Sequence, residues 1–294
     1  MEKPIYYKQK SGNIHPLREL EVMFKLAVMS SVCPDWDLET IAAAMRRHGY
    51  QGLEPRVEWG HACGIELGLS PVGRQEVRAR LEGEGLAFSC LATGARLATP
   101  DPAERGRHVE DLKRYIDLAG DLGCPWVRTF GGPRARDQEL ERIVEYTAEG
   151  YRPLLEQAEA RGVTLLLETH DDWSAAAPVR AVVERVAHPR LRVLWDFMHP
   201  QRLMEKPAET MLVLGQYTEY LHAHDGAYDE AGRMQILPLG EGIIDHAGAL
   251  ALLAGAGYEG YLSVEVIHQR GQPHDAEGVM RQYAEGLGEI AAGL

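Results

Sequence analysis

The chain has 294 residues, of which 45% are hydrophobic and 26% are charged, a composition typical of soluble globular proteins. Its 44 acidic residues outnumber the 31 basic ones and give a formal net charge of −13. Proteins that bind DNA or RNA usually present a basic surface, so this charge argues against nucleic acid as the main partner. No stretch has the apolar length of a membrane span, and the first residues lack the apolar core of a signal peptide.

The four cysteines lie far apart in the sequence and form no C-x-x-C pair; they are Cys33, Cys63, Cys90 and Cys124. This spacing indicates reduced thiols instead of a disulfide framework or a zinc knuckle. Together with the missing signal-peptide pattern, it leads us to expect a cytoplasmic protein with no membrane partner.

Eight short apolar runs alternate with longer segments of helical character. The runs that we expect to form strands are residues 23–32, 50–56, 86–94, 125–132, 163–170, 191–199, 219–226 and 261–268. The segments that we expect to form helices are residues 37–49, 105–123, 139–162, 177–188 and 246–257. Helical spacing of apolar residues and helix start and stop signals support these segments. Alternating strands and helices predict a parallel sheet built from βαβ units.

Eight such units predict an α/β fold with a single (β/α)8 domain, a TIM barrel. We place the barrel at residues 23–294, after an N-terminal extension of residues 1–22. The alternative, a doubly wound open sheet, normally has a glycine-rich phosphate loop after its first strand. The sequence CPDWDL follows the first strand here, so that loop is missing. Residues 56–71 are long for a connection between a strand and a helix, and we expect them to help cover the site.

The run VTLLLETHD at residues 163–171 reads as a buried strand that ends on a carboxylate and an imidazole. Burying a charge is costly unless it is paired or bound to a metal. Active sites of TIM barrels lie at the C-terminal ends of the strands, and such side chains recur at the ends of the last four predicted strands. The side chains that would converge are those of Glu168, Asp196, His222 and Glu265.

Three carboxylates that meet without a cation would repel one another and raise each other's pKa. A divalent cation resolves this conflict, and oxygen ligands with one imidazole suit Mn²⁺ or Mg²⁺, with Co²⁺ or Zn²⁺ as alternatives. We therefore predict one divalent metal ion, with Mn²⁺ favoured, held by these four residues. Each residue alone has a simpler interpretation, because a single strand-end carboxylate is more often a helix cap or an ion-pair partner. His222 alone could equally be a buried core histidine.

Other polar residues fall at the same ends of the predicted strands. The second strand carries Glu54 as well as an arginine, and the fourth strand carries an arginine that could meet a carbonyl or an anionic substrate group. The residues that we expect to contact a substrate are Arg56, His61, Arg128, His170, His199 and His224. Asp171 and Asp172 are expected to cap the segment that follows them.

Several motifs resemble the sugar phosphate isomerase/epimerase superfamily, the xylose-isomerase-like TIM barrels. They are LLLETHDDW, LWDFMHP, YLHAHDG, PLGEGIIDH and YLSVEVIH, in this order and spacing. GYQGLEPR and LGCPWVRTFGG resemble the second and fourth strands of that group, so the resemblance covers nearly the whole chain. The single-metal enzymes of the group hold their metal with Glu, Asp, His and Glu on strands 5 to 8. The ligands implied here are Glu168, Asp196, His222 and Glu265, with the two glutamates also serving as the acid–base pair.

The resemblance also maps His199, three residues after the aspartate, onto a substrate contact. Two features depart from the family. Epimerases of the group carry an arginine in H-x-G-E-N-x-R after the strand-7 histidine, whereas this chain has HAHDGAYDEAGR, and Arg233 lies too far on for that role. His224 stands where many relatives have lysine, which makes it a candidate to replace that contact with the substrate.

These features predict an isomerase or epimerase of a sugar or related polyhydroxy carbonyl compound. A metal-stabilised enediolate would form when Glu168 or Glu265 removes a proton, and the other glutamate would return it. A metal-dependent dehydratase of the inosose or 3-dehydroshikimate type is the alternative, because its first step is the same. A multi-zinc phosphodiesterase would need a further Asp-x-His pair, which the loop after the seventh strand lacks. A non-catalytic sugar-binding protein would show no metal binding. The expected partner is a small polyhydroxylated substrate, and a homo-oligomer is compatible with the family.

Overall fold

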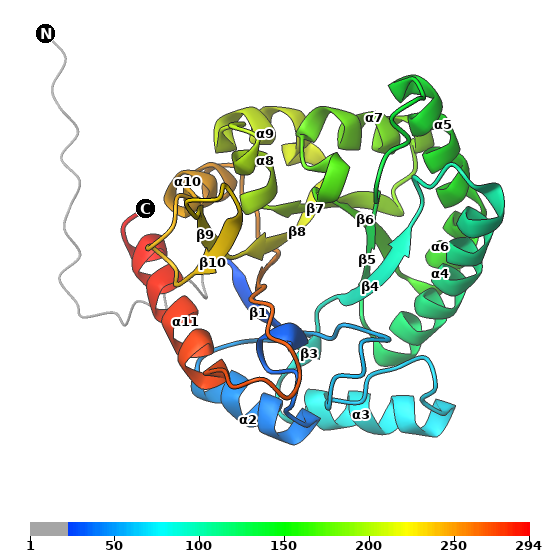
Figure 1. The fold of residues 1–294 in the computed structure, drawn as a ribbon. Coiled ribbons are helices and arrows are strands. Elements are labelled where there is room, and N and C mark those ends of the chain that lie inside the picture. Colours follow the sequence, from blue (N-terminus) through cyan, green and yellow to red (C-terminus); the bar gives the residue numbers. More distant parts are fainter. Residues whose placement is uncertain (1–22) are drawn as a thin grey trace, which may run out of the picture.

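The computed structural model describes residues 23–294, and the predicted extension of residues 1–22 lies outside the described residues. The strands gather in the centre and the helices surround them (Figure 1). The main sheet is parallel, with the order β3-β2-β1-β11-β8-β7-β6-β5-β4. Its strands are β1 (Lys25–Met29), β2 (Gly52–Glu54), β3 (Ala87–Phe88), β4 (Leu91–Arg96), β5 (Trp126–Phe130), β6 (Thr164–Glu168), β7 (Leu191–Asp196), β8 (Thr218–Ala223) and β11 (Tyr261–Val264).

The predicted third strand is present as two pieces, β3 and β4, separated only by Ser89 and Cys90. β3 pairs with β2, while β4 pairs with β5. A further parallel bridge joins Arg56 to Ala92. Because this interrupted strand pairs with both of its neighbours, it joins the two ends of the sheet. The predicted TIM barrel is therefore confirmed, with one of its eight strand positions broken in the middle.

Helices cover the outside of the barrel. They are α2 (Leu38–Arg47), α3 (Pro71–Gly83), α4 (Pro102–Leu122), α5 (Leu140–Tyr151), α6 (Leu155–Arg161), α7 (Ala176–Val186), α8 (Met198–Arg202), α9 (Pro207–Leu214), α10 (His246–Gly255) and α11 (Ala276–Ala292). The single predicted helix at 139–162 is interrupted by a short turn containing Pro153, since proline removes a helical hydrogen bond. Four helices, α3, α8, α9 and α11, are absent from the prediction. In α3 the reason is visible, because only Leu81 is buried and its apolar periodicity is weak.

The predicted seventh strand ends earlier than expected. β8 stops at Ala223, and the chain then forms a hairpin of β9 (Asp225–Tyr228) and β10 (Met234–Leu237), which pair antiparallel in a separate sheet. The carboxylate of Asp225 fixes the base of the hairpin by accepting hydrogen bonds from the backbone N–H groups of Gly226, Gly240 and Ile244. The hairpin lies beside the barrel, near α11 (Figure 1).

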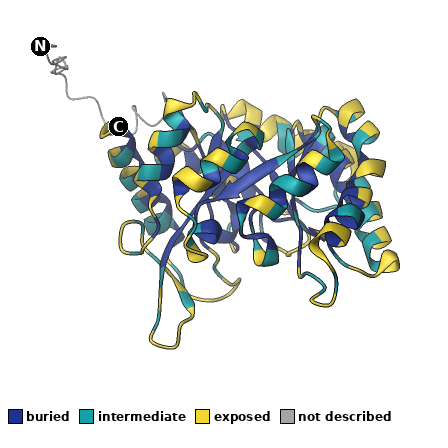
Figure 2. Ribbon diagram, turned by 90° about the horizontal axis from the view of Figure 1, so that it is seen from above, coloured by how far each residue is buried: buried dark blue, intermediate teal, exposed yellow. Residues whose placement is uncertain are grey.

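Apolar side chains pack on both sides of the strands. The larger core lies between the strands and the helices, and the helices keep their exposed residues on their outer faces (Figure 2). The smaller core lies inside the barrel and consists of Ala27, Cys90, Leu166, Leu194, Tyr220 and Tyr261. Because side chains alternate along a strand, the residues two positions further on point into the barrel one layer higher. That next layer contains the candidate site.

Two expectations from the sequence concern the chain as a whole. All four cysteines are buried and free of disulfides, as their spacing predicts. Among residues 23–294, no helix combines the length and the apolar character needed to cross a membrane.

Candidate metal centre

Four strands bring the predicted metal ligands to one point. Glu168 is the last residue of β6 and Asp196 the last of β7, His222 lies in β8, and Glu265 directly follows β11. All four residues are buried, and one potential ligand atom from each lies within 4.8 Å of the others. The convergence that the sequence predicts is therefore present in the structure.

The imidazole of His222 lies at the centre of this group. Its Nδ1 is 3.0 Å from Oε1 of Glu168 and 3.0 Å from Oε2 of Glu265. A ring nitrogen carries at most one proton, so it cannot fully satisfy both carboxylates. Oε2 of Glu168 and Oδ2 of Asp196 form no well-aligned hydrogen bond in the part of the chain that the structure describes, although the guanidinium of Arg128 and the imidazole of His224 lie near them. Buried carboxylate oxygens without donors are costly, and a cation placed among them would satisfy them.

The buried charges around His222 do not balance. Four buried carboxylates surround it, those of Glu54, Glu168, Asp196 and Glu265. Two buried guanidinium groups lie nearby, those of Arg56 and Arg128, and Nη1 of Arg128 is 3.3 Å from Oε2 of Glu168. With the imidazole of His222 neutral, as a metal ligand requires, two negative charges remain, which is the charge that one divalent cation neutralises. The oxygen-rich ligand set and the charge deficit both fit a divalent metal ion.

Glu54, at the end of β2, is one of the polar strand-end residues of the sequence, but the prediction assigns it no role in the site. Its two carboxylate oxygens lie 3.0 and 3.1 Å from Nε2 of His222, on the side of the ring away from Nδ1. A carboxylate in this position favours a proton on Nε2 and leaves Nδ1 free to face a cation. The hydroxyl of Tyr220 donates to Oε2 of Glu54 at 3.2 Å. The sequence feature that could identify Glu54 as a site residue is its position at the end of a buried strand, which Glu168 shares.

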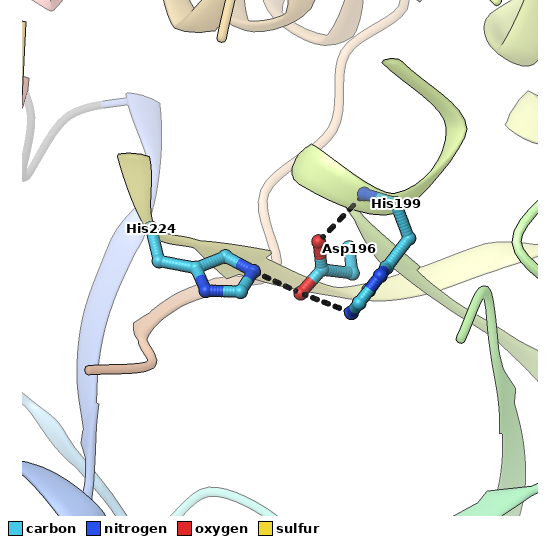
Figure 3. A group of neighbouring side chains, drawn as sticks. All are labelled: Asp196, His199 and His224. Atoms are coloured by element: carbon cyan, nitrogen blue, oxygen red, sulfur yellow. Dashed lines mark hydrogen bonds and ion pairs between the residues drawn. The ribbon is translucent and has the colours of Figure 1, made fainter. Parts of the chain in front are cut away.

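Asp196 also belongs to a second group of ligand-type side chains, with His199 and His224 (Figure 3). Its Oδ1 accepts hydrogen bonds from the backbone N–H groups of Met198 and His199, at 2.8 and 3.2 Å. Its Oδ2 is 2.8 Å from Nε2 of His224 and 3.9 Å from Nε2 of His199. Because Oδ1 is already bonded to the backbone, Oδ2 is the oxygen of Asp196 that can take part both in the four-residue group around His222 and in the group with His199 and His224. The two histidines therefore border the predicted metal position.

The pKa shifts follow from this crowding. Burial disfavours a charged imidazolium at His222, but Glu54, Glu265 and Glu168 outweigh burial and raise the pKa of His222 well above 6.5. Burial also opposes charge on Glu265, yet His222 lowers the pKa of Glu265 well below its ordinary value.

The pKa of Asp196 shows the same balance, because burial raises it but the nearby His224 and His199 lower it to about 2. Burial lowers the pKa of His199 to about 4. Asp196 and Glu265 are thus ionised at neutral pH, as metal ligands must be, while His199 is neutral.

The carboxylate group opens into a cavity of about 440 Å³, which is lined at one end by Glu265, His170, His199 and His224. The rings of His170 and His199 pack with centroids 4.3 Å apart. Nδ1 of His170 is 2.9 Å from Oδ1 of Asp171. Three of the predicted substrate contacts therefore share one cavity with a predicted metal ligand.

The other predicted substrate contacts are Arg128, on β5, and Arg56 and His61, in the segment after β2. Arg128 is only 1% exposed, and the guanidinium of Arg56 stacks 3.6 Å from the ring centroid of Trp59. Nδ1 of His61 is 2.8 Å from the hydroxyl of Ser30, which also accepts from the backbone N–H of Arg56. Within the segment 56–71, Trp59 thus covers Arg56. Contact of Arg56, Arg128 and His61 with a substrate stays a prediction.

The expected role of Asp171 and Asp172 as caps is wrong. Asp171 has a left-handed backbone conformation, with φ of 49°, which turns its carboxylate back to His170. Asp172 instead accepts a hydrogen bond from the backbone N–H of Arg134 at 2.8 Å and one from the guanidinium of Arg136. Both carboxylates therefore hold neighbouring loop residues, and neither caps the turn at Asp171–Trp173 nor α7.

Comparison with known proteins agrees with this architecture. Over 220 residues, the chain is 26% identical to the Escherichia coli (strain K12) protein SgbU, a proposed L-ribulose-5-phosphate 3-epimerase, with 72% of this chain and 73% of SgbU covered. The structure of the IOLI protein with a bound zinc atom superposes with a TM-score of 0.79 at 16% identity, covering 92% of this chain and 98% of that one. The structure of an L-ribulose 3-epimerase gives a TM-score of 0.73 at 21% identity, covering 92% and 95%.

These structural similarities show the same barrel fold. The sequence model of the xylose isomerase-like TIM barrels matches residues 42–290, which is most of the chain. This match confirms the resemblance that the motifs at the strand ends indicate. The chain belongs to the xylose isomerase-like TIM barrel family.

Proposed function

We propose that this protein is a divalent-metal-dependent isomerase or epimerase of a sugar or related polyhydroxy carbonyl compound. The observation that carries the proposal is the buried convergence of Glu168, Asp196, His222 and Glu265 in one layer of the barrel. The epimerase names of two similar proteins and the zinc atom in a third support it. Residues 23–294 would form the whole catalytic unit, with Mn²⁺ favoured by the mainly oxygen ligand set.

The four converging residues would hold the cation, which when bound supplies Lewis-acid polarisation of a carbonyl and its neighbouring hydroxyl. Glu168 and Glu265 approach Nδ1 of His222 from β6 and β11, two strands separated by β7 and β8. One carboxylate would remove the proton from the carbon beside the carbonyl, and the other would return a proton to the next carbon or to the opposite face. Two carboxylates on different strands supply the two proton-transfer positions that this chemistry requires.

The surrounding residues would orient these groups. Glu54 holds the imidazole of His222 from Nε2, and Tyr220 holds Glu54. His199 is neutral at neutral pH, so it can both donate and accept a hydrogen bond with a substrate hydroxyl. His170 and His224 line the same cavity and would contact neighbouring hydroxyls.

The proposal is tested by incubating the Mn²⁺-loaded protein in ²H₂O with a panel of ketoses, inososes and 3-dehydroshikimate. We expect solvent deuterium to enter one class of compound at the carbon beside the carbonyl, as seen by NMR. Glu168→Gln and Glu265→Gln should abolish this exchange. Glu259→Gln is the matched control, because Glu259 is exposed and lies just before the opposite end of β11 from Glu265. Wild-type exchange in either of the first two variants would contradict the assigned proton transfer.

A dehydratase is the second candidate, and the pair formed by His170 and Asp171 favours it. Burial opposes charge on His170, but Asp171, together with Glu168 and Glu265, outweighs burial and raises the pKa of His170. His170 also lines the cavity that contains Glu265. His170 could therefore deliver a proton to a leaving hydroxyl after a glutamate has removed the α-proton. A product with a new conjugated C=C bond absorbs in the ultraviolet, so absorbance during turnover separates dehydration from isomerisation.

A further inference from the structure

The cavity beside the carboxylates has two unlike ends. Its inner end is lined by Glu265 and by three histidines, as described above. Its outer end is mainly apolar and contains Met198, Tyr228, Met234, Ile236 and Ile267, beside Gly232 and two exposed arginines, Arg202 and Arg233. These apolar residues come from α8, from the hairpin β9–β10 and from the segment that follows β11.

Three residues of the apolar end are unusually accessible. Tyr228 is 47% exposed, Ile236 43% and Ile267 53%. Single exposed apolar residues are common on protein surfaces, but a group of them gathered around one cavity marks a binding surface. The group is continuous with the carboxylate site, because Ile236, Ile267 and Glu265 line the same space.

The hairpin is built to present this apolar surface. Met234 and Ile236 alternate with Gln235 along β10, and side chains two residues apart lie on one face of a strand. Met234 and Ile236 both line the cavity, whereas the amide of Gln235 donates to Asp229 at 3.1 Å. The sequence of β10 thus separates an apolar face toward the cavity from a polar face away from it.

Gly226 leaves room for the side chains of Met198 and Met234 at this surface. Gly226 faces Ile236 in the hairpin register. A Cβ atom at Gly226 would lie 3.0 Å from Sδ of Met234 and 3.2 Å from Cε of Met198, and too close to the backbone oxygen of Gln235. A larger residue would therefore disturb the pairing of the hairpin as well as the two methionines. Methionine side chains are flexible and polarisable and adapt to apolar ligands of differing shape. The outer end can therefore accept an alkyl or an aromatic group.

We propose that the substrate carries an apolar substituent on its polyhydroxy part and that the hairpin β9–β10 binds this substituent. The inference rests on the proposed function, which places the polyhydroxy carbonyl part at the carboxylates. Hydroxyls of a sugar that lie against Met234, Ile236 and Ile267 would find no hydrogen-bond partner in these three side chains. An apolar substituent instead removes its own surface and that of the three side chains from water.

The test measures binding to the Mn²⁺-treated protein by calorimetry, with D-glucose compared with phenyl β-D-glucoside, phenyl β-D-galactoside and phenyl β-D-xyloside. We expect at least one phenyl glycoside to bind about tenfold or more tightly than the free sugar, since modest apolar groups give differences of this size in a hydrophobic pocket. The Ile236→Ser, Ile267→Ser double variant should lose this advantage while its Mn²⁺ binding stays unchanged. Ile243→Ser is the matched control, because Ile243 is 56% exposed and lies outside the lining of the cavity.

Three results would overturn the inference. The first is that no phenyl glycoside binds more tightly than D-glucose. The second is that the double variant binds the phenyl glycoside as tightly as the wild type does. The third is a change in sedimentation from dimer to monomer in the double variant with unchanged glycoside affinity, which would assign the apolar end to a subunit interface. Absence of Mn²⁺ binding with retained phenyl glycoside binding would refute the proposed metal-dependent function alone and leave the apolar site standing.

Discussion

Two layers of side chains inside the same barrel differ completely in chemistry, although the same strands supply both. The lower layer contains Leu166, Leu194 and Tyr220 and is apolar. Two residues further along each strand, the upper layer contains Glu168, Asp196 and His222, which are buried just as deeply. A step of two residues keeps a side chain pointing into the barrel, so position along the strand alone separates packing from chemistry.

This contrast shows how the barrel tolerates a cluster of buried charges. The lower layer fills the interior with apolar side chains, which closes the space beneath the carboxylates. The upper layer carries more negative than positive charge and opens to a cavity. Tyr220 connects the layers, because its ring packs in the lower one and its hydroxyl donates to Glu54 in the upper one. Substitutions in the two layers should therefore have different consequences.

The largest expected effect comes from the upper layer. Glu265→Gln removes a carboxylate that we propose transfers a proton, but it keeps the size of the side chain. We expect the rate of solvent deuterium exchange into the substrate to fall by about 10³-fold, the usual scale of general acid–base catalysis. Circular dichroism should show an intact fold. An exchange rate within a few-fold of the wild type would remove Glu265 from the proposed mechanism.

The lower layer should respond in stability instead of catalysis. Leu194 is fully buried, and Leu194→Ala should lower the free energy of unfolding by about 2–5 kcal/mol through lost contacts and the cavity left behind. The folded variant should still bind one Mn²⁺, because Asp196 lies on the same strand one layer higher. Urea denaturation and metal titration of the same sample check both parts. Loss of metal binding without loss of stability would show that the layers do not act separately.

Glu54 sharpens the comparison, because it acts on the upper layer through His222. Glu54→Gln keeps the shape of the side chain but removes the charge that holds Nε2 of His222. We expect Mn²⁺ affinity to weaken by about 10–100-fold, as is typical when the partner of a metal-bound histidine is lost. Tyr220→Phe removes only the hydroxyl bonded to Glu54 and should weaken affinity less. Equal affinities in Glu54→Gln and the wild type would argue against this role.

The smallest expected effect concerns pH and lies at the edge of the upper layer. Burial, together with the nearby Arg56, lowers the pKa of His61 from 6.5 to about 4. The unfolded chain takes up a proton on this residue as pH falls from 6.5 to 4, but the folded protein does not, so stability falls over that range. Chemical denaturation of His61→Gln should show a shallower loss between these pH values. The remaining loss would include His199, whose pKa is also about 4. An identical pH dependence in the variant would contradict the buried neutral state of His61.

The sequence allows the fold to be predicted because apolar runs alternate with amphipathic helices around the whole barrel. The interruption between β3 and β4 is not predictable from periodicity, since Ser89 and Cys90 are small residues inside an otherwise apolar run. Helix α8 is hidden for another reason. Its first two residues, Met198 and His199, belong to the run 191–199 that predicts a strand, and the turn depends on Oδ1 of Asp196 accepting the N–H groups of these two residues.

The site can be predicted where a polar residue ends a strand and has a counterpart on the next strand. That signal predicts the convergence of Glu168, Asp196, His222 and Glu265, which the structure shows, while their role as metal ligands stays a prediction. It does not identify Glu54, because the role of Glu54 depends on how the ring of His222 is turned, which only the tertiary structure shows. The hairpin β9–β10 is missed for a related reason, since its pairing depends on Asp225 binding backbone groups up to Ile244.

The most direct test of the central claim is the metal content of the purified protein after exposure to Mn²⁺ and removal of free metal. We predict one ion per chain in the wild type, loss of that ion in the Glu168→Gln, Glu265→Gln double variant, and retention in Glu259→Gln. Calorimetric titration should give the same stoichiometry and show proton release, because a cation displaces the proton that the carboxylates hold on His222. A wild-type protein that binds no divalent metal, or a double variant that binds it as tightly as the wild type, would contradict the claim that these four residues form a metal centre.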